Sequence, residues 1–423
     1  MRVEKTLKLK LHPLTSEDRI LLYDLLSKYK RMLRLAVDVV FSKDIRSVKR
    51  AHEELYQPLR KMFSELHNKY AEEAYKKALS MYKSYRKLMK KFERGLLKSS
   101  PSKPEPEADI VDLHISAFRI EVRKRFAIVK VSYGNGRRML FAVYDWRLPK
   151  MLSEGWKPKN SRIVIDNGIW LHLVISKDFE IKEGENVLAI DINEESVDCA
   201  LYIRSQQKLI FLSVRHDIKQ LRMKYRAMRE KVQKKLKDKP RERDKVLARY
   251  GRRERNRVDD RTRKLTTLLA EIARKFNATL VREKLEFPRK RTRNRSLNYR
   301  LNVFCYRKII ANLDYKLFER GLKVIEINPK GTSITCPICG YKDRKNRVDV
   351  RKFRCKKCGF EFDAQFVACL NLLRSYDGVA QRSRGGNFLR WVPRVVGTTA
   401  SDEVLIDDVL RGKPRVILAK LAV

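Results

Sequence analysis

The chain has 423 residues, of which 98 are Lys or Arg and 51 are Asp or Glu, so its formal net charge is +47. Positive charge on this scale repels itself unless a polyanion neutralises it, which makes nucleic acid the expected partner. A hydrophobic fraction of 43% excludes disorder by composition, and no apolar run of about 20 residues is present to span a membrane. The N-terminal residues also lack the apolar core of a signal peptide. We expect a cytoplasmic, nucleoid-associated protein that does not act at a membrane.

The first hundred residues predict one strand followed by helices. Residues 3–12 alternate between apolar and polar side chains, as a half-buried strand does. Thr15 and Asp18 then form a helix-capping sequence, and a helical pattern continues to about Leu97. Tyrosines recur at helical spacing in its last part. A helix that packs its own core explains them, and a platform for stacking bases is the alternative.

A second β region is expected after a linker rich in Pro and Ser at residues 99–107. Strand-like segments there flank the turn sequences Gly134-Asn135-Gly136 and Asp166-Asn167-Gly168. The first strand and these later strands can form one sheet or barrel. We therefore expect a β domain made of residues 1–14 and 108–185, with a helical insertion and its linker at residues 15–107.

A new unit begins near residue 186 with an almost unbroken apolar run at 187–192, which is typical of a buried strand. Two more strand patterns follow at hairpin distance. Residues 216–275 are then helical and very basic, with breaks expected near Pro240 and Gly251. A charge run is usually a solvated helix face, but in a chain of this charge it favours a surface that follows phosphates. We assign nucleic-acid contacts to Lys231, Lys234, Lys235, Arg252 and Arg253.

Four of the seven cysteines form two close pairs. Cys336 and Cys339 are followed by a glycine, as are Cys355 and Cys358, and 15 residues separate the pairs. This spacing is typical of a four-thiolate zinc site. Because protein ligands fill all four positions of the tetrahedron, we expect structural Zn²⁺.

Three acids stand near strand ends or beside the cysteine motif. Asp191 interrupts an apolar strand, Glu283 ends another strand pattern, and Asp363 lies just beyond the cysteines. A buried carboxylate needs a partner or a metal, so each acid alone could belong to an ion pair. Together, such carboxylates can hold two divalent ions that cleave a phosphodiester bond.

The order of these motifs resembles the TnpB family of transposon-encoded nucleases, which are related to the type V CRISPR effectors. The resemblance rests on Ala189-Ile190-Asp191, Val281-Arg282-Glu283, the segment from Ile327 to Cys336, and the segment from Phe362 to Asn371. It implies an α+β multidomain protein whose N-terminal β domain is wedge-like and whose helical insertion is a recognition lobe. It further implies an RNase H-like (RuvC) α/β nuclease domain with an inserted four-cysteine zinc ribbon. The corresponding ranges are 186–330 and 363–385 for the nuclease domain, 331–362 for the ribbon, and 386–423 for a C-terminal tail.

The same resemblance implies an RNA-guided DNA endonuclease encoded by a transposable element. Such a protein binds a guide RNA from its own element and cuts matching double-stranded DNA, and we expect it to act as a monomer or weak dimer. Asp191, Glu283 and Asp363 would be the catalytic acids and would hold Mg²⁺ or Mn²⁺.

Two positions depart from the family pattern. Asn193 replaces a usual glycine, which is expected to affect the turn more than the metal. Gln365 lies six residues before Asn371, where the family usually has its third acid. An amide carries no charge and is a weak ligand for Mg²⁺. We favour Asp363 as the replacement acid, and the alternative is a nuclease-impaired, RNA-guided repressor.

A third hypothesis is a basic ribbon protein of the transcription or ribosome machinery, without guide or chemistry. The positions of Asp191 and Glu283 relative to the ribbon argue against it.

Overall fold

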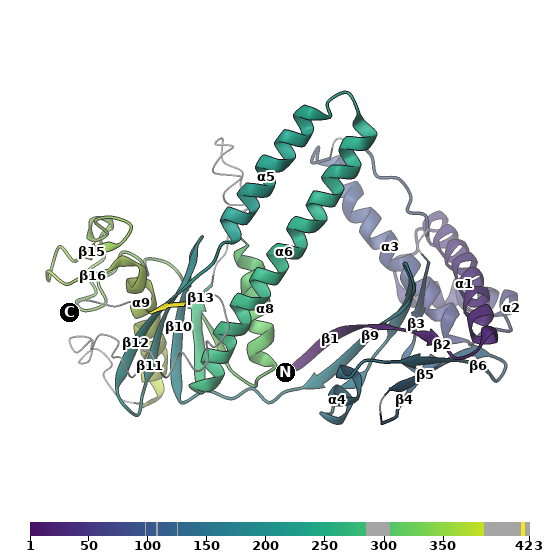
Figure 1. Cartoon of the computed structure of the whole chain (residues 1–423), viewed down its shortest axis with the longest axis horizontal. Helices are drawn as coiled ribbons and strands as arrows, with labels where there is room; N and C mark the ends of the chain where they lie inside the picture. The colour runs from purple at the N-terminus through teal and green to yellow at the C-terminus, as the bar shows by residue number, and fades with distance from the viewer. Residues whose placement is uncertain (98, 107–108, 125, 285–304, 385–415, 419–423) are drawn as a thin grey trace. The chain divides into compact units, whose positions relative to one another are not determined.

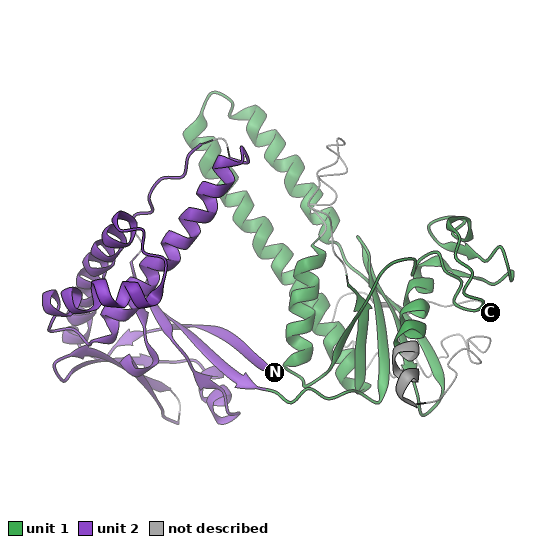
Figure 2. Cartoon of the chain, turned by 180° about the vertical axis from the view of Figure 1, so that it is seen from behind, with its two compact units in different colours: residues 1, 179–423 green, residues 2–178 purple. Residues whose placement is uncertain are grey.

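The computed structural model describes the whole chain except residues 98, 107–108, 125, 285–304, 385–415 and 419–423. These residues form two compact units, one of residues 2–178 and one of residue 1 with residues 179–423 (Figure 2). In the part of the chain that is described, no helix combines the length and apolar content needed to cross a bilayer.

The helices of the first unit are α1 (Ser16–Ser42), α2 (Val48–Met62) and α3 (Lys69–Glu93). The predicted capping sequence begins α1, because the Asp18 N–H donates to the Thr15 hydroxyl at 3.1 Å and the Thr15 N–H donates to the Asp18 carboxylate at 2.9 Å. On α3 the tyrosines at 70, 75 and 82 are buried. They therefore pack the core of this unit, as expected for the simpler of the two explanations.

Two antiparallel sheets accompany these helices. One has the order β1-β9-β8-β3, with β7 paired to β9, and the other has the order β2-β6-β5-β4. The first strand does join the later β region, since β1 pairs with β9 along its full length. The expected single sheet or barrel is in fact two sheets, and the chain passes from one to the other at Leu11, between β1 and β2. Their bounds are β1 Arg2–Lys10, β2 His12–Pro13, β3 Ile110–Leu113, β4 Phe118–Val122, β5 Ala127–Gly134, β6 Arg137–Val143, β7 Lys157–Pro158, β8 Ser161–Ile165 and β9 Ile169–Asp178, with the short helices η1 Ile115–Ala117 and α4 Arg147–Ser153 between them.

The second unit is built on a sheet with the order β14-β13-β10-β11-β12-β17 (Figure 1). The strands β10, β11 and β12 are antiparallel neighbours, whereas β13 and β14 run parallel to β10. Most of the expected C-terminal tail lies outside the described residues, and its described part, β17, pairs with β12. The bounds are β10 Asn186–Ile192, β11 Ser196–Ile203, β12 Lys208–Arg215, β13 Ala278–Glu283, β14 Val324–Ile327 and β17 Val416–Leu418.

Helices cover both faces of this sheet. Leu188 and Ile190 pack with α6 (Pro240–Lys275) and α8 (Tyr306–Phe318) on one face. Val187 and Ala189 pack with α9 (Ala364–Arg384) on the other. Because side chains alternate along a strand, Asp191 faces the α9 side. The same alternation places Glu283 on that side as well.

A long helical hairpin connects β12 to β13. It consists of α5 (Ile218–Lys235) and α6, which are joined by a short turn just before Pro240 (Figure 1). The predicted break at Pro240 is confirmed, because the proline opens α6 at its first turn. The predicted break at Gly251 is wrong, since α6 runs through it without interruption. A glycine in a helix costs only about 1 kcal/mol, and the buried second half of α6 holds the helix in place.

The cysteine region forms a small ribbon that leads into α9. Its strands β15 (Lys352–Arg354) and β16 (Glu361–Asp363) pair antiparallel, and the short helix η2 (Arg344–Asn346) precedes them. Phe353 and Val367 belong to one small core that joins the ribbon to α9.

Candidate metal, carboxylate and nucleic-acid sites

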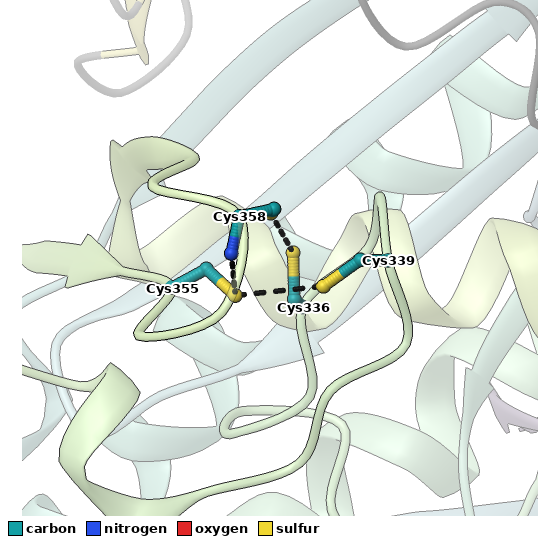
Figure 3. A group of neighbouring side chains, drawn as sticks. All are labelled: Cys336, Cys339, Cys355 and Cys358. Carbon is teal, nitrogen blue, oxygen red and sulfur yellow. Dashed lines mark hydrogen bonds between the residues drawn. The ribbon is translucent and has the colours of Figure 1, made fainter.

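The four cysteines of the two pairs converge (Figure 3). Their sulfur atoms lie within 4.8 Å of one another, with Cys336 Sγ 3.6 Å from Cys358 Sγ and Cys339 Sγ 3.5 Å from Cys355 Sγ. A tetrahedron with roughly 2.3 Å metal–sulfur bonds has sulfurs about 3.8 Å apart. The cluster therefore fits a zinc site.

The two cysteine turns have the same backbone geometry. The N–H of Gly340 donates to the Cys336 carbonyl at 3.0 Å, and the N–H of Gly359 donates to the Cys355 carbonyl at 3.0 Å. The φ angles of the two glycines are 73° and 74°, in the region where a side chain is strained. Each glycine thus lets its chain turn back so that both sulfurs of the pair point to one centre.

The backbone also favours thiolate at one of these positions. Burial disfavours the charged form of Cys355, but the N–H groups of Cys358 and Lys357, at 3.5 and 3.4 Å from its sulfur, lower its pKa to about 7. At Cys336 burial raises the pKa to about 12. A dication that binds all four sulfurs must therefore displace protons, as thiolate ligation of zinc requires.

Asn346 organises the ribbon and has no obvious signal in the sequence. It is fully buried, and its amide nitrogen donates to the carbonyls of Ile334 and Tyr341 at 3.0 and 3.1 Å. Its side-chain oxygen accepts the Lys356 N–H at 3.0 Å, so one side chain joins the two cysteine turns. The residue looks like an ordinary polar loop residue until the fold brings both turns against it.

Asp191 and Glu283 come together at the carboxyl ends of neighbouring parallel strands. The β10–β13 register pairs Ile190 with Arg282, which makes the two acids the next residues on each strand. Burial, followed by the nearby Glu283 charge, raises the pKa of Asp191 to about 7. Burial also raises the pKa of Glu283, although the Thr332 hydroxyl donates to this carboxylate and opposes the shift. Two desolvated acids that repel each other favour a bound cation.

A further acid, Asp198, was not identified from the sequence. It lies opposite Asp191 in the β10–β11 register and is fully buried. The hydroxyls of Ser213 and Ser196 donate to it at 2.5 and 2.9 Å. Polar residues at alternate positions of an apolar strand, Ser196 and Asp198, were the available signal, but their partner is known only from the register.

Asn193 links these two acids. Its side-chain nitrogen donates to Asp191 Oδ2 at 3.1 Å and to Asp198 Oδ2 at 2.9 Å. Its backbone N–H also closes the turn by donating to the Ser196 carbonyl at 2.8 Å. The expectation that Asn193 affects mainly the turn is therefore incomplete, because the side chain also holds the carboxylate of Asp191.

Asp363 lies at the junction of β16 and α9. Its Oδ1 accepts the Gln365 N–H at 2.9 Å, so Asp363 caps the helix. The pKa of Asp198 is raised, mainly by burial, and the nearby charge of Asp363 adds to this shift. Gln365 lines a pocket of about 310 Å³ together with Ser213 and Arg351. The three predicted acids do not form a compact ligand group: in the described parts of the chain, the cysteines are the one set of three or more ligand side chains within 4.8 Å.

The helix α9 ties the ribbon to the carboxylates. The buried Asn371 donates to the carbonyls of Thr332 and Thr335, both at 2.7 Å. Since the Thr332 hydroxyl contacts Glu283, Asn371 fixes the segment that holds this acid. The Arg374 guanidinium donates to the Cys336 carbonyl at 3.2 Å, which attaches the same helix to the ribbon.

The basic residues assigned to nucleic acid lie on the helical hairpin. Within the described chain, these five side chains are exposed and form no ion pair with a carboxylate: Lys231, Lys234, Lys235, Arg252 and Arg253. By contrast, the buried Glu254 binds Arg229 and Arg222 and clamps α5 to α6. The hairpin thus has an internal ionic clamp and a separate set of uncompensated surface cations.

Two family models match parts of the sequence. The model described as the TNB domain of Cas12f1-like proteins matches residues 306–372, which include the ribbon and the start of α9. The model of the uncharacterised MJ0013 family matches residues 25–124.

Individual relatives agree with the first of these models. The TnpB-like protein MJ0751 of Methanocaldococcus jannaschii is 31% identical over 236 residues, which cover 54% of this chain and 84% of the relative. The CRISPR-associated endodeoxyribonuclease Cas12f1 of Sulfoacidibacillus thermotolerans is 38% identical over 72 residues, 17% of each chain. The fold is similar to that in the solved complex of Cas12f1 with guide RNA and target DNA, with a TM-score of 0.50 at 13% identity, covering 88% of this chain and 98% of the other.

Proposed function

Because the chain belongs to the family of TnpB-like proteins, we propose that it is an RNA-guided DNA endonuclease encoded by a transposable element. Its partners on this proposal are a guide RNA from the same element and the double-stranded DNA that matches it. The relatives named as CRISPR endodeoxyribonucleases, and the Cas12f1 complex with guide RNA and DNA, support this class of activity.

The observation that carries the proposal is the meeting of Asp191 and Glu283 at one edge of the sheet. The sheet has three antiparallel strands, β10, β11 and β12, followed in the chain by β13 and β14, which run parallel to β10. This arrangement, with acids near the ends of β10 and β13, supports an RNase H-like (RuvC) nuclease domain. Carboxylate oxygens suit Mg²⁺ or Mn²⁺, which would supply charge neutralisation at the scissile phosphate. Within the protein, Asn193 orients Asp191 and Thr332 orients Glu283.

The decisive experiment is reconstitution with the RNA encoded next to the gene. Cleavage of a guide-matched duplex in Mg²⁺ or Mn²⁺, and not of a mismatched duplex, is the expected result. Tight binding to the matched duplex without cleavage in either metal would favour the guided repressor, in which Gln365 disables the site. Failure to bind any guide RNA would contradict both.

The third acid can be tested with a substitution that keeps the helix cap. Asp363→Asn retains an oxygen that can cap α9, but it removes the negative charge. If Asp363 is the third ligand, we expect cleavage to fall at least about 100-fold, a loss typical of removing one electrostatic group from an active site, while the melting temperature stays within a few degrees.

The matched change is Gln365→Asp, which restores a charge at the usual family position. It should raise cleavage if that position still faces the metal. If Asp363→Asn cleaves as well as the unaltered protein and Gln365→Asp cleaves faster, then Asp363 is not the replacement acid.

The basic hairpin should make nucleic-acid binding depend on salt. We expect Lys231, Lys234 and Lys235, replaced together by Gln, to flatten the log–log salt dependence of guide-RNA binding by about 2, because each neutralised phosphate contributes about 0.7 to the slope on a single strand. The matched control replaces Lys182, Lys264 and Arg274, each of which pairs with a nearby carboxylate. Equal slopes for both triple variants would mean that the hairpin cations form an ordinary solvated face.

A further inference from the structure

We propose that Asp198 is a positioning residue of the candidate nuclease site: through the side-chain amide of Asn193 it fixes the direction of the Asp191 carboxylate, which would receive a divalent ion. The inference rests on the proposed function and deepens it, because it concerns how this site holds its cation. Asp198 is fully buried, whereas Asp191 is half-buried. Asp191 is therefore the acid that can meet an ion, and Asp198 acts through its neighbours.

Asp198 is the middle member of a polar row that crosses three neighbouring strands (Figure 1). In the strand registers it lies directly opposite Asp191 of β10 and directly opposite Ser213 of β12. Residues directly opposite on neighbouring strands share one face of the sheet. The helix α9 covers this face at Asp198, since the Cys369 thiol donates to the Asp198 carbonyl at 3.2 Å. The row therefore places a buried carboxylate beside an accessible one.

A carboxylate at this position is unfavourable for the fold alone. Burial removes water from its charge, and the like charge of Asp191 directly opposite destabilises the strand pairing. The side chains that donate to Asp198 are all neutral: Asn193, Ser196 and Ser213. A residue that opposes the stability of its own strand in this way is typical of a functional site.

The amide of Asn193 connects the two acids. Its nitrogen has two hydrogens, and it donates to Asp191 Oδ2 at 3.1 Å and to Asp198 Oδ2 at 2.9 Å. An ionised carboxylate only accepts hydrogen bonds, so the two acids together select the orientation in which the nitrogen of the amide faces them. Removal of Asp198 takes away one of the two hydrogen bonds that select this orientation.

Asp198 is itself held at both oxygens. The Ser213 hydroxyl donates to its Oδ1 at 2.5 Å, and the Ser196 hydroxyl donates to its Oδ2 at 2.9 Å. These serines belong to β12 and β11, so two strands fix the plane of the carboxylate. The rigid sheet thereby determines where the Asn193 amide lies. On Asp191 the amide occupies Oδ2 and leaves Oδ1 for a divalent ion.

The turn between β10 and β11 does not require Asp198. The Asn193 N–H closes it by donating to the Ser196 carbonyl at 2.8 Å, and the His216 N–H donates to the Glu195 carbonyl at 2.8 Å. The residues before and after Asp198, Val197 and Cys199, pack in the apolar core. An apolar side chain at position 198 would therefore suit β11, and loss of the carboxylate should affect the cation more than the fold.

The test compares Asp198→Val with Asp198→Asn in the full chain. Valine removes every acceptor, whereas asparagine can accept from Asn193 and Ser196 with its oxygen and donate to Ser213 with its nitrogen. Mn²⁺ should raise the melting temperature of the protein without nucleic acid, and Asp191→Ala shows which part of this rise belongs to the site. We expect Asp198→Val to need about 10- to 100-fold more Mn²⁺ for the same rise, and Asp198→Asn to stay within about threefold of the unaltered protein.

The matched control is Asp18→Ala in the first unit. Asp18 is also a buried carboxylate, and it accepts hydrogen bonds from the Thr15 N–H, the Thr15 hydroxyl and the Leu140 N–H. Its loss should lower the melting temperature without a change in the Mn²⁺ concentration that produces the rise. The control therefore separates loss of a buried acid in general from loss of the acid beside Asn193.

A double variant tests whether Asp198 acts through Asn193. Asn193→Gly removes the amide and should weaken the Mn²⁺ response about as much as Asp198→Val does. Adding Asp198→Val to Asn193→Gly should change the response by less than about threefold, because residues that act in one network are not additive. Losses that multiply in the double variant would overturn the inference.

The conservative variant excludes a different cause. Equal losses in Asp198→Asn and Asp198→Val would mean that the charge of Asp198, and not its hydrogen bonds, supports the cation, which also overturns the inference. If Asp198→Val does not fold, the other two single variants decide: the inference requires a weakened response in Asn193→Gly and a retained response in Asp198→Asn.

Cleavage of guide-matched DNA separates this inference from the proposed function. The Mg²⁺ concentration for half-maximal cleavage should rise in Asp198→Val by about the factor measured with Mn²⁺. If the unaltered protein cleaves and Asp198→Val equals it in both measurements, the inference fails and the nuclease proposal stands. If the unaltered protein cleaves in neither metal, the nuclease proposal fails and the Mn²⁺ response still decides the role of Asp198. A melting temperature with no Mn²⁺-dependent rise that requires Asp191 would overturn the inference.

Discussion

Asp191→Ala is expected to reduce cleavage of guide-matched DNA by roughly a thousandfold, with guide-RNA affinity changed by less than about threefold. Asp191 lies beside Glu283 at the proposed metal site and is held by a hydrogen bond from Asn193, so its removal takes away one of the two acids that meet there. Single-turnover cleavage and guide binding, measured on the same preparation, separate the two effects. The matched control is Asp260→Ala on the surface of α6, which should leave cleavage unaltered.

The same reasoning gives a pH dependence. Because burial and Glu283 raise the pKa of Asp191 to about 7, protons compete with a divalent cation for this carboxylate at neutral pH. Cleavage at limiting Mg²⁺ should fall as the pH drops through about 7, and more Mg²⁺ should move the midpoint of this fall to lower pH.

The raised pKa of Asp191 also affects stability. Above the pKa that Asp191 has in the unfolded chain, its charged form destabilises the metal-free fold. Asp191→Asn should therefore raise the melting temperature at pH 8 in buffer without Mg²⁺ or Mn²⁺. A cleavage rate that does not change with pH would contradict the role of Asp191.

Cys355→Ser should lower the zinc content from one ion per chain to nearly none and unfold the ribbon. The binding energy of a structural zinc site is also the folding energy of the segment that holds it. The ribbon's own core is small, and Asn346 can join the two cysteine turns only while both are formed. Metal analysis gives the first result, and protease sensitivity within residues 331–362 gives the second.

The control for this change is Cys305→Ser. Cys305 lies outside the cluster and contacts Arg222 through its sulfur, a contact that a hydroxyl can replace. It should retain a full equivalent of zinc. A full equivalent in Cys355→Ser would show that Cys355 is not a ligand.

The ribbon was predictable because its signal is local. Two C-x-x-C-G turns specify both the ligands and the left-handed glycines, and the structure places all four sulfurs together. Asp191 and Glu283 were also predictable, since Asp191 interrupts an apolar strand near its end and Glu283 ends another strand, and both patterns are clear in the sequence. The roles assigned to them, and to Asp363, remain predictions.

Features that depend on strand register were not predictable. Asp198 and Asn193 become partners of Asp191 only because β10 and β11 pair in one register. The pairing of Arg119 with Lys130 has the same origin, since these residues are eleven apart in the sequence but directly opposite in the sheet. A one-residue shift in either pairing would move these side chains to the other face.

The length of α6 sets a scale for what the hairpin can touch. Its 36 residues extend for about 54 Å, which equals about one and a half turns of a nucleic-acid duplex. The residues of α6 that pack in the core of the sheet begin at Val258, and Glu254 before it is buried against α5, so the part of α6 before Val258 extends beyond that core. If the hairpin cations bind nucleic acid as proposed, removal of one complete turn from each helix is expected to shorten the protected stretch of nucleic acid by about 5 Å and to leave the sheet and its acids in place.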